Sequence, residues 1–78
     1  MKLDILTPQK PLFSGEVDSV TLPGVSGAFT ILADHAPMIS SLRMDGEISY
    51  TQNHKMETLV IGGGFVEVWK NQVTVCVE

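Results

Sequence analysis

The stretch "FVEVWKNQVTVCVE", Phe65 to Glu78, decides the fold class of this chain. In each of its two halves, Phe65–Trp69 and Val73–Val77, valines alternate with other side chains at a period of two residues. Asn71 lies between the halves. A period of two places alternate side chains on opposite faces of an extended strand, and Asn favours tight turns. The stretch therefore predicts a β-hairpin.

The rest of the chain repeats this organisation. Clusters of Gly, Pro, Asn and Asp recur about every eight to ten residues, and the runs between them are rich in Val, Ile, Thr, Phe and Tyr. The stretch Glu47–Ile61 lacks Gly and Pro but is polar in its middle, so it predicts a second hairpin. No apolar stripe persists at helical spacing. The residues favour one all-β domain over 1–78, a sandwich or a barrel.

Composition limits what this domain can be. A chain of 78 residues builds only a small core, and its single cysteine, Cys76, cannot form an internal disulfide. A closed zinc site needs four ligands, and the chain has only Cys76, His35 and His54 as Cys or His side chains. We therefore expect no metal and no cofactor. A small domain without such links often gains stability from a partner subunit.

Charge and hydropathy exclude further classes. The net charge is −4 with only five basic residues, which is too few for a phosphate-binding face, so we expect no nucleic-acid partner. The chain shows no targeting peptide after Met1, and no apolar run approaches the roughly 20 residues of a membrane span. These features favour a soluble cytosolic protein.

Two motifs could carry chemistry. In "GAFTILADHAPM", Gly27–Met38, an acid precedes a histidine, but no nucleophile elbow or metal ligand completes the set, and neighbours on an extended chain point to opposite faces. The structural interpretation, without catalysis, is that Asp34 caps a turn and His35 packs or hydrogen-bonds beside Pro37. The glycines 62–64 lead into a strand rather than a helix, which favours a bulge or a close backbone approach over a phosphate loop.

Several ordered motifs point to a family. Read together, "LTPQKPLFSGEVDSVTLPGVSGAF", "ILADHAPMISSLR" and "GGGFVEVWKNQVTVCVE" resemble the N-terminal domain of the epsilon subunit of F-type ATP synthases, from Lys2 to the last residue. The resemblance implies a flattened β-sandwich of short antiparallel strands at the foot of the rotating central stalk. It also implies a non-catalytic subunit that binds the gamma subunit and the membrane rotor ring and couples proton flow to ATP synthesis. Such a subunit would lie peripherally at the cytoplasmic face of the bacterial inner membrane.

The resemblance also assigns contacts to particular residues. It places at the rotor ring the turn formed by Ser26, Gly27, Ala28 and Phe29. It places near gamma the end of the first strand and a later turn with the strand that follows: Thr7, His35, Ala36, Pro37, Met38, Ile39 and Ser40. Apolar Met and Ile side chains suit an adaptable interface.

The chain departs from the family pattern at three places. Ala28 stands where most members have Glu, and Asp34 stands where they have Gly, which predicts that Asp34 adopts a glycine-like backbone conformation. Members usually continue into a C-terminal helical hairpin that inhibits ATP hydrolysis, and this sequence has no such hairpin after Glu78. If the subunit ends there, we expect this inhibition to be absent. Two alternatives remain: a free-standing β-sandwich that binds a small molecule or peptide, and an enzyme that uses Asp34 and His35.

Overall fold

The computed structural model describes residues 1–78 as nine strands without a helix. Their bounds are β1 (Lys2–Leu6), β2 (Pro11–Glu16), β3 (Ser19–Gly24), β4 (Gly27–Leu32), β5 (Met38–Leu42), β6 (Gly46–Gln52), β7 (Lys55–Ile61), β8 (Gly64–Trp69) and β9 (Gln72–Val77). No helix in the structure has the length and hydropathy needed to cross a membrane.

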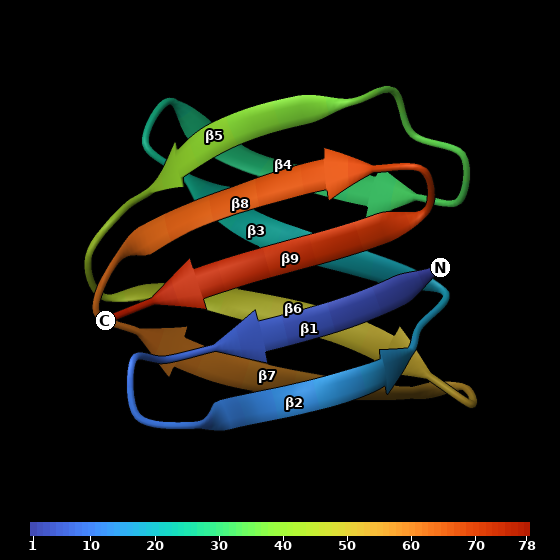
Figure 1. Ribbon diagram of the computed structural model, residues 1–78, viewed down its shortest axis with the longest axis horizontal. Coiled ribbons are helices and arrows are strands. Elements are labelled where there is room, and N and C mark those ends of the chain that lie inside the picture. Colours follow the sequence, from blue (N-terminus) through green and yellow to red (C-terminus); the bar gives the residue numbers. More distant parts are fainter.

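The strands form two layers (Figure 1). The front sheet has the order β2-β1-β9-β8-β5, and the back sheet has the order β4-β3-β6-β7. The layers are joined at one corner, where Gly24 of β3 pairs with Leu42 of β5. The molecule extends 26 × 23 × 19 Å. The predicted all-β sandwich is confirmed.

One strand pair is parallel. β1 pairs with β9 in parallel from Lys2↔Gln72 to Leu6↔Cys76, whereas every other pairing is antiparallel. Antiparallel pairs can form between strands joined by a tight turn, but parallel pairs require a long connection. The first and last strands meet across the whole chain, so no turn signal in the sequence specifies their direction.

The core lies between the two layers and follows from the alternation. Every other residue of β9 is buried, and β1, β3, β6 and β8 also bury alternate side chains. Fourteen buried aliphatic side chains form one cluster: Leu3, Ile5, Val17, Val20, Leu22, Ile31, Leu42, Ile48, Ile61, Val66, Val68, Val73, Val75 and Val77. Phe13 of β2 and Tyr50 of β6 pack against this cluster and against each other, with ring centroids 4.3 Å apart.

Both predicted hairpins are confirmed by their turns. Asn53 and His54 join β6 to β7 with φ of 52° and 65°, and Lys70 and Asn71 join β8 to β9 with φ of 48° and 60°. Two consecutive residues with positive φ match the right-handed twist of the flanking strands, and Asn tolerates this conformation well.

The glycines at the start of β8 mark a close backbone approach, as predicted. Gly64 has a φ of 148°, and a Cβ atom placed on it would lie 2.0 Å from the carbonyl oxygen of Cys76 in β9. Gly64 pairs with Val77 of β9 and with Leu42 of β5. A side chain at this position would therefore separate the strands of the front sheet.

Candidate functional site

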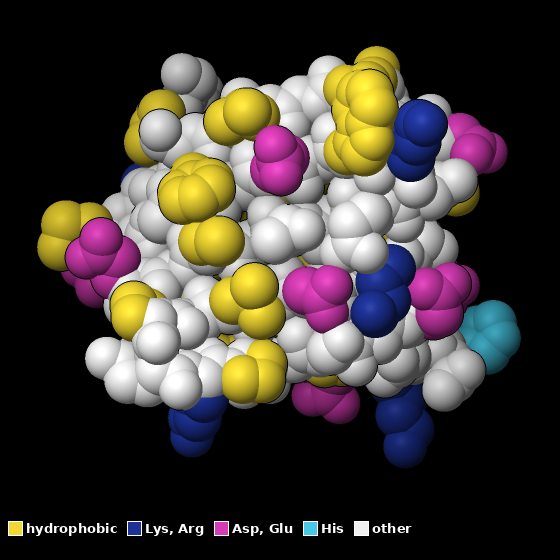
Figure 2. Space-filling model, in the orientation of Figure 1, with side chains coloured by type: hydrophobic (Ala, Val, Ile, Leu, Met, Phe, Trp, Pro, Cys, Tyr) yellow, Lys and Arg dark blue, Asp and Glu magenta, His cyan; other side chains and the backbone are white.

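The outer face of the front sheet carries apolar side chains that the core does not use. Leu6, Cys76 and Phe65 form a row across β1, β9 and β8, because each pairs with the next in register. Farther along the sheet, Ile39 is 72% exposed and Trp69 56% exposed. Figure 2 shows hydrophobic side chains over the left and upper parts of this face with one acidic side chain among them, while further charged side chains gather at the right. Exposed apolar groups that gather on one face indicate an interaction surface.

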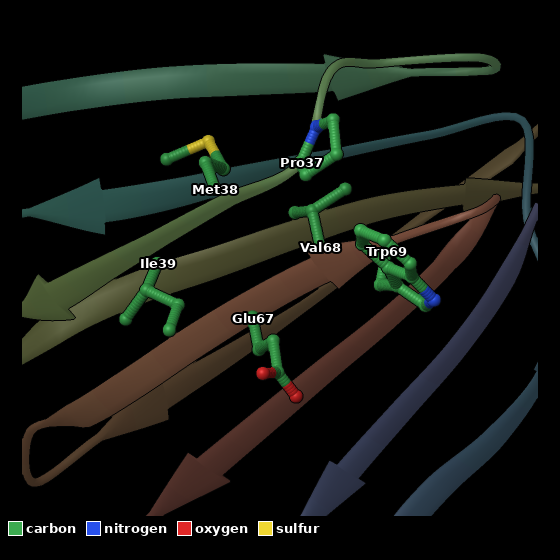
Figure 3. A pocket seen from close by; sticks show the side chains of 6 residues that line it. All are labelled: Pro37, Met38, Ile39, Glu67, Val68 and Trp69. Atoms are coloured by element: carbon green, nitrogen blue, oxygen red, sulfur yellow. The ribbon is translucent and has the colours of Figure 1, made fainter.

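A groove lies at one end of this face, between β5 and β8. It is lined by Pro37, Met38, Ile39, Glu67, Val68 and Trp69. In Figure 3, the side chains of Ile39 and Glu67 project from one side of the sheet, and those of Met38 and Val68 project from the other. The register agrees, because Ile39 pairs with Glu67 and Met38 with Val68. The groove thus has Ile39, Glu67 and Trp69 as its projecting side chains.

A second hollow lies at the opposite end of the same face. It is lined by residues of β1, the turn that follows it, β8, β9 and the end of the chain: Leu6, Thr7, Pro8, Gly64, Phe65, Cys76, Val77 and Glu78. The hydroxyl of Thr7 donates to the Lys10 carbonyl oxygen at 2.7 Å and accepts from the Lys10 N–H at 3.0 Å. Thr7 therefore shapes the turn between β1 and β2.

The residues that the resemblance assigns to gamma do not form one cluster. Thr7 lies at the end of the front sheet opposite to His35, Ala36 and Pro37 (Figure 1). Ile39 is exposed, but Met38 is half-buried and packs against the core, and the Ser40 hydroxyl donates to the Ser41 carbonyl oxygen at 3.2 Å. Of the adjacent pair Met38 and Ile39, only Ile39 projects from the outer face.

Asp34 is held by the hairpin turn between β8 and β9 rather than by His35. Its N–H donates to Oδ1 of Asn71 at 2.6 Å, and Nδ2 of Asn71 donates back to Oδ1 of Asp34 at 2.8 Å. Nδ1 of His35 lies 2.7 Å from the carbonyl oxygen of Ala36. The φ of Asp34 is 64°, so the predicted glycine-like conformation is confirmed. Asp34 and His35 thus form part of a turn before β5, and the two hydrogen bonds between Asp34 and Asn71 fix this turn against the β8–β9 hairpin.

The residues assigned to the rotor ring lie at the other end of the sandwich. Val25 and Ser26 form a two-residue turn between β3 and β4, and Ser26, Gly27 and Ala28 are exposed. The Phe29 side chain turns inward and packs against the core. Figure 1 places this turn at the end of the molecule opposite to the loop that leads into β5.

Sequence reasoning missed the contributions of Phe65, Glu67 and Trp69 to this surface. Their alternation with the valines of β8 already placed them on one face, but a period of two does not say which face is covered by the second sheet. Only the pairing of β8 with β5 shows that Glu67 and Trp69 lie beside the Pro37–Ile39 segment.

One carboxylate on this face has a displaced pKa. The pKa of Asp4 is lowered chiefly by a hydrogen bond from Ser14, and further by Gln72 and by the charge of Lys2, while partial burial opposes the shift. Nε2 of Gln72 donates to Oδ2 of Asp4 at 2.8 Å. No group of three or more His, Cys, Asp or Glu side chains is placed to hold a metal ion.

Related proteins carry the same domain. The 43%-identical epsilon chain of the ATP synthase from Chlorobaculum tepidum aligns with 97% of this chain, which covers 86% of that protein. The epsilon chain from Chlorobium limicola is 45% identical over 99% of this chain and 88% of its own length. The epsilon chain from Leptospira interrogans is 36% identical, but this chain spans only 61% of its length.

Solved structures share the fold. A chain of the Euglena gracilis mitochondrial ATP synthase superposes with a TM-score of 0.88 at 23% identity, over 96% of this chain and 48% of that chain. A chain of the Tetrahymena thermophila mitochondrial ATP synthase, solved as central stalk and c-ring, gives 0.82 at 16% identity, over 97% of this chain and 61% of that one. The family described as ATP synthase, Delta/Epsilon chain, beta-sandwich domain matches residues 1–78. The chain therefore belongs to the epsilon-chain family of ATP synthases and forms its N-terminal β-sandwich domain.

Proposed function

We propose that this chain is a non-catalytic subunit of the central stalk of a proton-translocating ATP synthase, where it binds the gamma subunit and the rotor ring. The observation that carries the proposal is the apolar outer face of the front sheet, with Ile39, Phe65 and Trp69 exposed. A domain of 78 residues has little stability to spare, and a partner that covers this face would add to it.

The position of the two loops supports a division of contacts. The outer face of the front sheet, from Thr7 to the loop that contains His35 and Pro37, would bind gamma. The turn between β3 and β4 would reach the ring with Ser26, Gly27 and Ala28, and its small side chains leave the backbone open to contact. A subunit held at both places would rotate with the stalk and transmit torque from the ring at the cytoplasmic face of the bacterial membrane.

Capture of the complex tests this function. A tagged copy of the chain, expressed in the organism that encodes it, should co-purify with gamma and with the catalytic head. The isolated domain should show no change in melting temperature with small molecules or peptides, unlike a free-standing binding module. Capture of the chain without gamma would reject the proposal.

A further inference from the structure

Glu67 has an unusual place in the groove between β5 and β8. The other lining residues, Pro37, Met38, Ile39, Val68 and Trp69, are apolar or aromatic, so Glu67 is the one ionisable side chain there. Its cross-strand neighbours are Ile39 on β5 and Thr74 on β9. The two ion pairs of the chain lie elsewhere, between the N-terminal amine and Glu16 and between Lys2 and Asp4.

The nearest basic side chain along the strand is already engaged. Nζ of Lys70 lies over the Trp69 ring, 5.4 Å from its centroid. A cation on an aromatic face is stabilised there by about 0.5–1 kcal/mol at an exposed site. The carboxylate of Glu67 therefore depends on water for its solvation as long as the groove is open.

A partner that fills the groove removes this water. An uncompensated carboxylate at a buried interface costs several kcal/mol, so a surface that is purely apolar would bind this groove poorly. The same carboxylate becomes favourable when the partner brings a cation to it and an apolar group to Ile39 and Trp69.

We infer that the gamma subunit covers this groove with an apolar side chain flanked by a lysine or arginine that pairs with Glu67. The inference rests on the proposed function and specifies the chemistry of the partner at that site. Arginine suits the groove better than lysine, because its planar guanidinium can stack on Trp69 while it donates two hydrogen bonds to the carboxylate. The net charge of −4 favours a basic partner surface as well.

Glu67→Gln tests the pairing because it keeps the shape of the side chain and removes its charge. The matched control is Glu47→Gln, which changes an exposed glutamate of β6 on the back sheet. The affinity of each variant for the gamma-containing head complex of the same organism is measured at low and high salt. We expect Glu67→Gln to bind at least about 30-fold more weakly with a shallower salt dependence, and Glu47→Gln to match the wild type within about twofold.

The outcomes separate this inference from the proposed function. If the wild type binds gamma and Glu67→Gln binds equally well or better, the charge pairing is wrong while the stalk assignment stands. If the wild type does not bind gamma, both are wrong. A second variant, Glu67→Lys, should lose binding to wild-type gamma and regain it with a gamma variant in which the partner lysine or arginine is changed to Glu.

Discussion

The two outer faces of the sandwich are built by the same alternation but carry different chemistry. The front face exposes Ile39, Phe65 and Trp69. The back face carries a row of hydroxyl side chains that crosses all four strands in register, from β4 through β3 and β6 to β7: Thr30, Thr21, Ser49 and Thr58. Its exposed apolar side chains, Leu32, Met56 and Val60, lie on the two edge strands and are all aliphatic. The hydroxyls of Thr21 and Thr30 lie 2.9 Å apart.

This difference distinguishes the hydroxyl row, which can remain in water, from the aromatic groups of the front face, which favour a partner. Thr has a high strand propensity because of its branched Cβ atom, and its hydroxyl is compatible with water. The aromatic and aliphatic groups of the front face expose apolar surface that water solvates poorly. The hydroxyl row of the back face is thus suited to solvent, whereas the aromatic side chains Phe65 and Trp69 are exposed on the front face alone and are suited to burial against another subunit.

The largest expected effect comes from breaking the front sheet itself. Gly64→Ala should reduce the free energy of unfolding by about 3 kcal/mol or more, since its Cβ would lie 2.0 Å from the Cys76 carbonyl oxygen. Gly27, at the start of β4 in the back sheet, also has a positive φ, but a Cβ there meets no atom within 4 Å. Gly27→Ala should therefore cost only about 1–2 kcal/mol of backbone strain. Urea denaturation of both variants measures the difference, and equal losses would contradict the close approach in the front sheet.

A second comparison concerns two side chains of similar exposure on opposite faces. Trp69 is 56% exposed on the front face and Leu32 is 59% exposed on β4. Trp69→Thr should weaken binding to gamma about 100-fold, because buried Trp side chains often dominate interfaces, whereas Leu32→Thr should leave the affinity unchanged. Each should change the free energy of unfolding by less than about 1 kcal/mol.

Titration calorimetry with the gamma-containing head complex checks this prediction. If Leu32→Thr weakens binding as much as Trp69→Thr does, gamma contacts the back face too, and the contrast between the faces loses its functional meaning. Melting curves for both variants ensure that a loss of binding does not reflect a loss of folding.

Much of the fold could be predicted from the sequence because its signals are local. The hairpin of β8 and β9 follows from alternation around Asn71, whereas the positive φ of Asp34 was predicted from the glycine that the family has at this position. The parallel pairing of β1 with β9 could not be predicted, because it joins residues nearly a whole chain apart, such as Lys2 and Gln72. No local turn or spacing records such a contact.

The interaction surface was only partly accessible to sequence reasoning, for the same reason. The Pro37–Ile39 segment was assigned to gamma by resemblance, but its neighbours Glu67 and Trp69 reach it through the pairing of β5 with β8. Adjacent residues also point in opposite directions, so Met38 packs against the core while Ile39 projects from the face. A resemblance that assigns a whole segment to a partner does not say which of its alternating side chains face outward.

The smallest expected effect is a change in the free energy of unfolding that depends on pH for a front-sheet variant and not for a back-sheet variant. Because hydrogen bonds from Ser14 and Gln72 and the charge of Lys2 lower the folded-state pKa of Asp4 below 3.8, the ionised carboxylate stabilises the front sheet at neutral pH. This contribution is present above the unfolded pKa and is lost as the pH falls from about 4 through the folded pKa. Asp4→Asn should therefore cost about 0.5–1 kcal/mol at pH 7, and its unfolding curve should converge with that of the wild type as the pH falls below 3.8.

The back face offers the control for this pH dependence. Thr21→Val removes the contact between the Thr21 and Thr30 hydroxyls, and neither residue titrates, so its cost should be the same at pH 7 and at pH 3. Urea unfolding of the two variants at both pH values gives the comparison directly. A loss for Asp4→Asn that does not change with pH would mean that Asp4 acts through shape and hydrogen bonding alone, and that the charge on the front face does not stabilise the isolated domain.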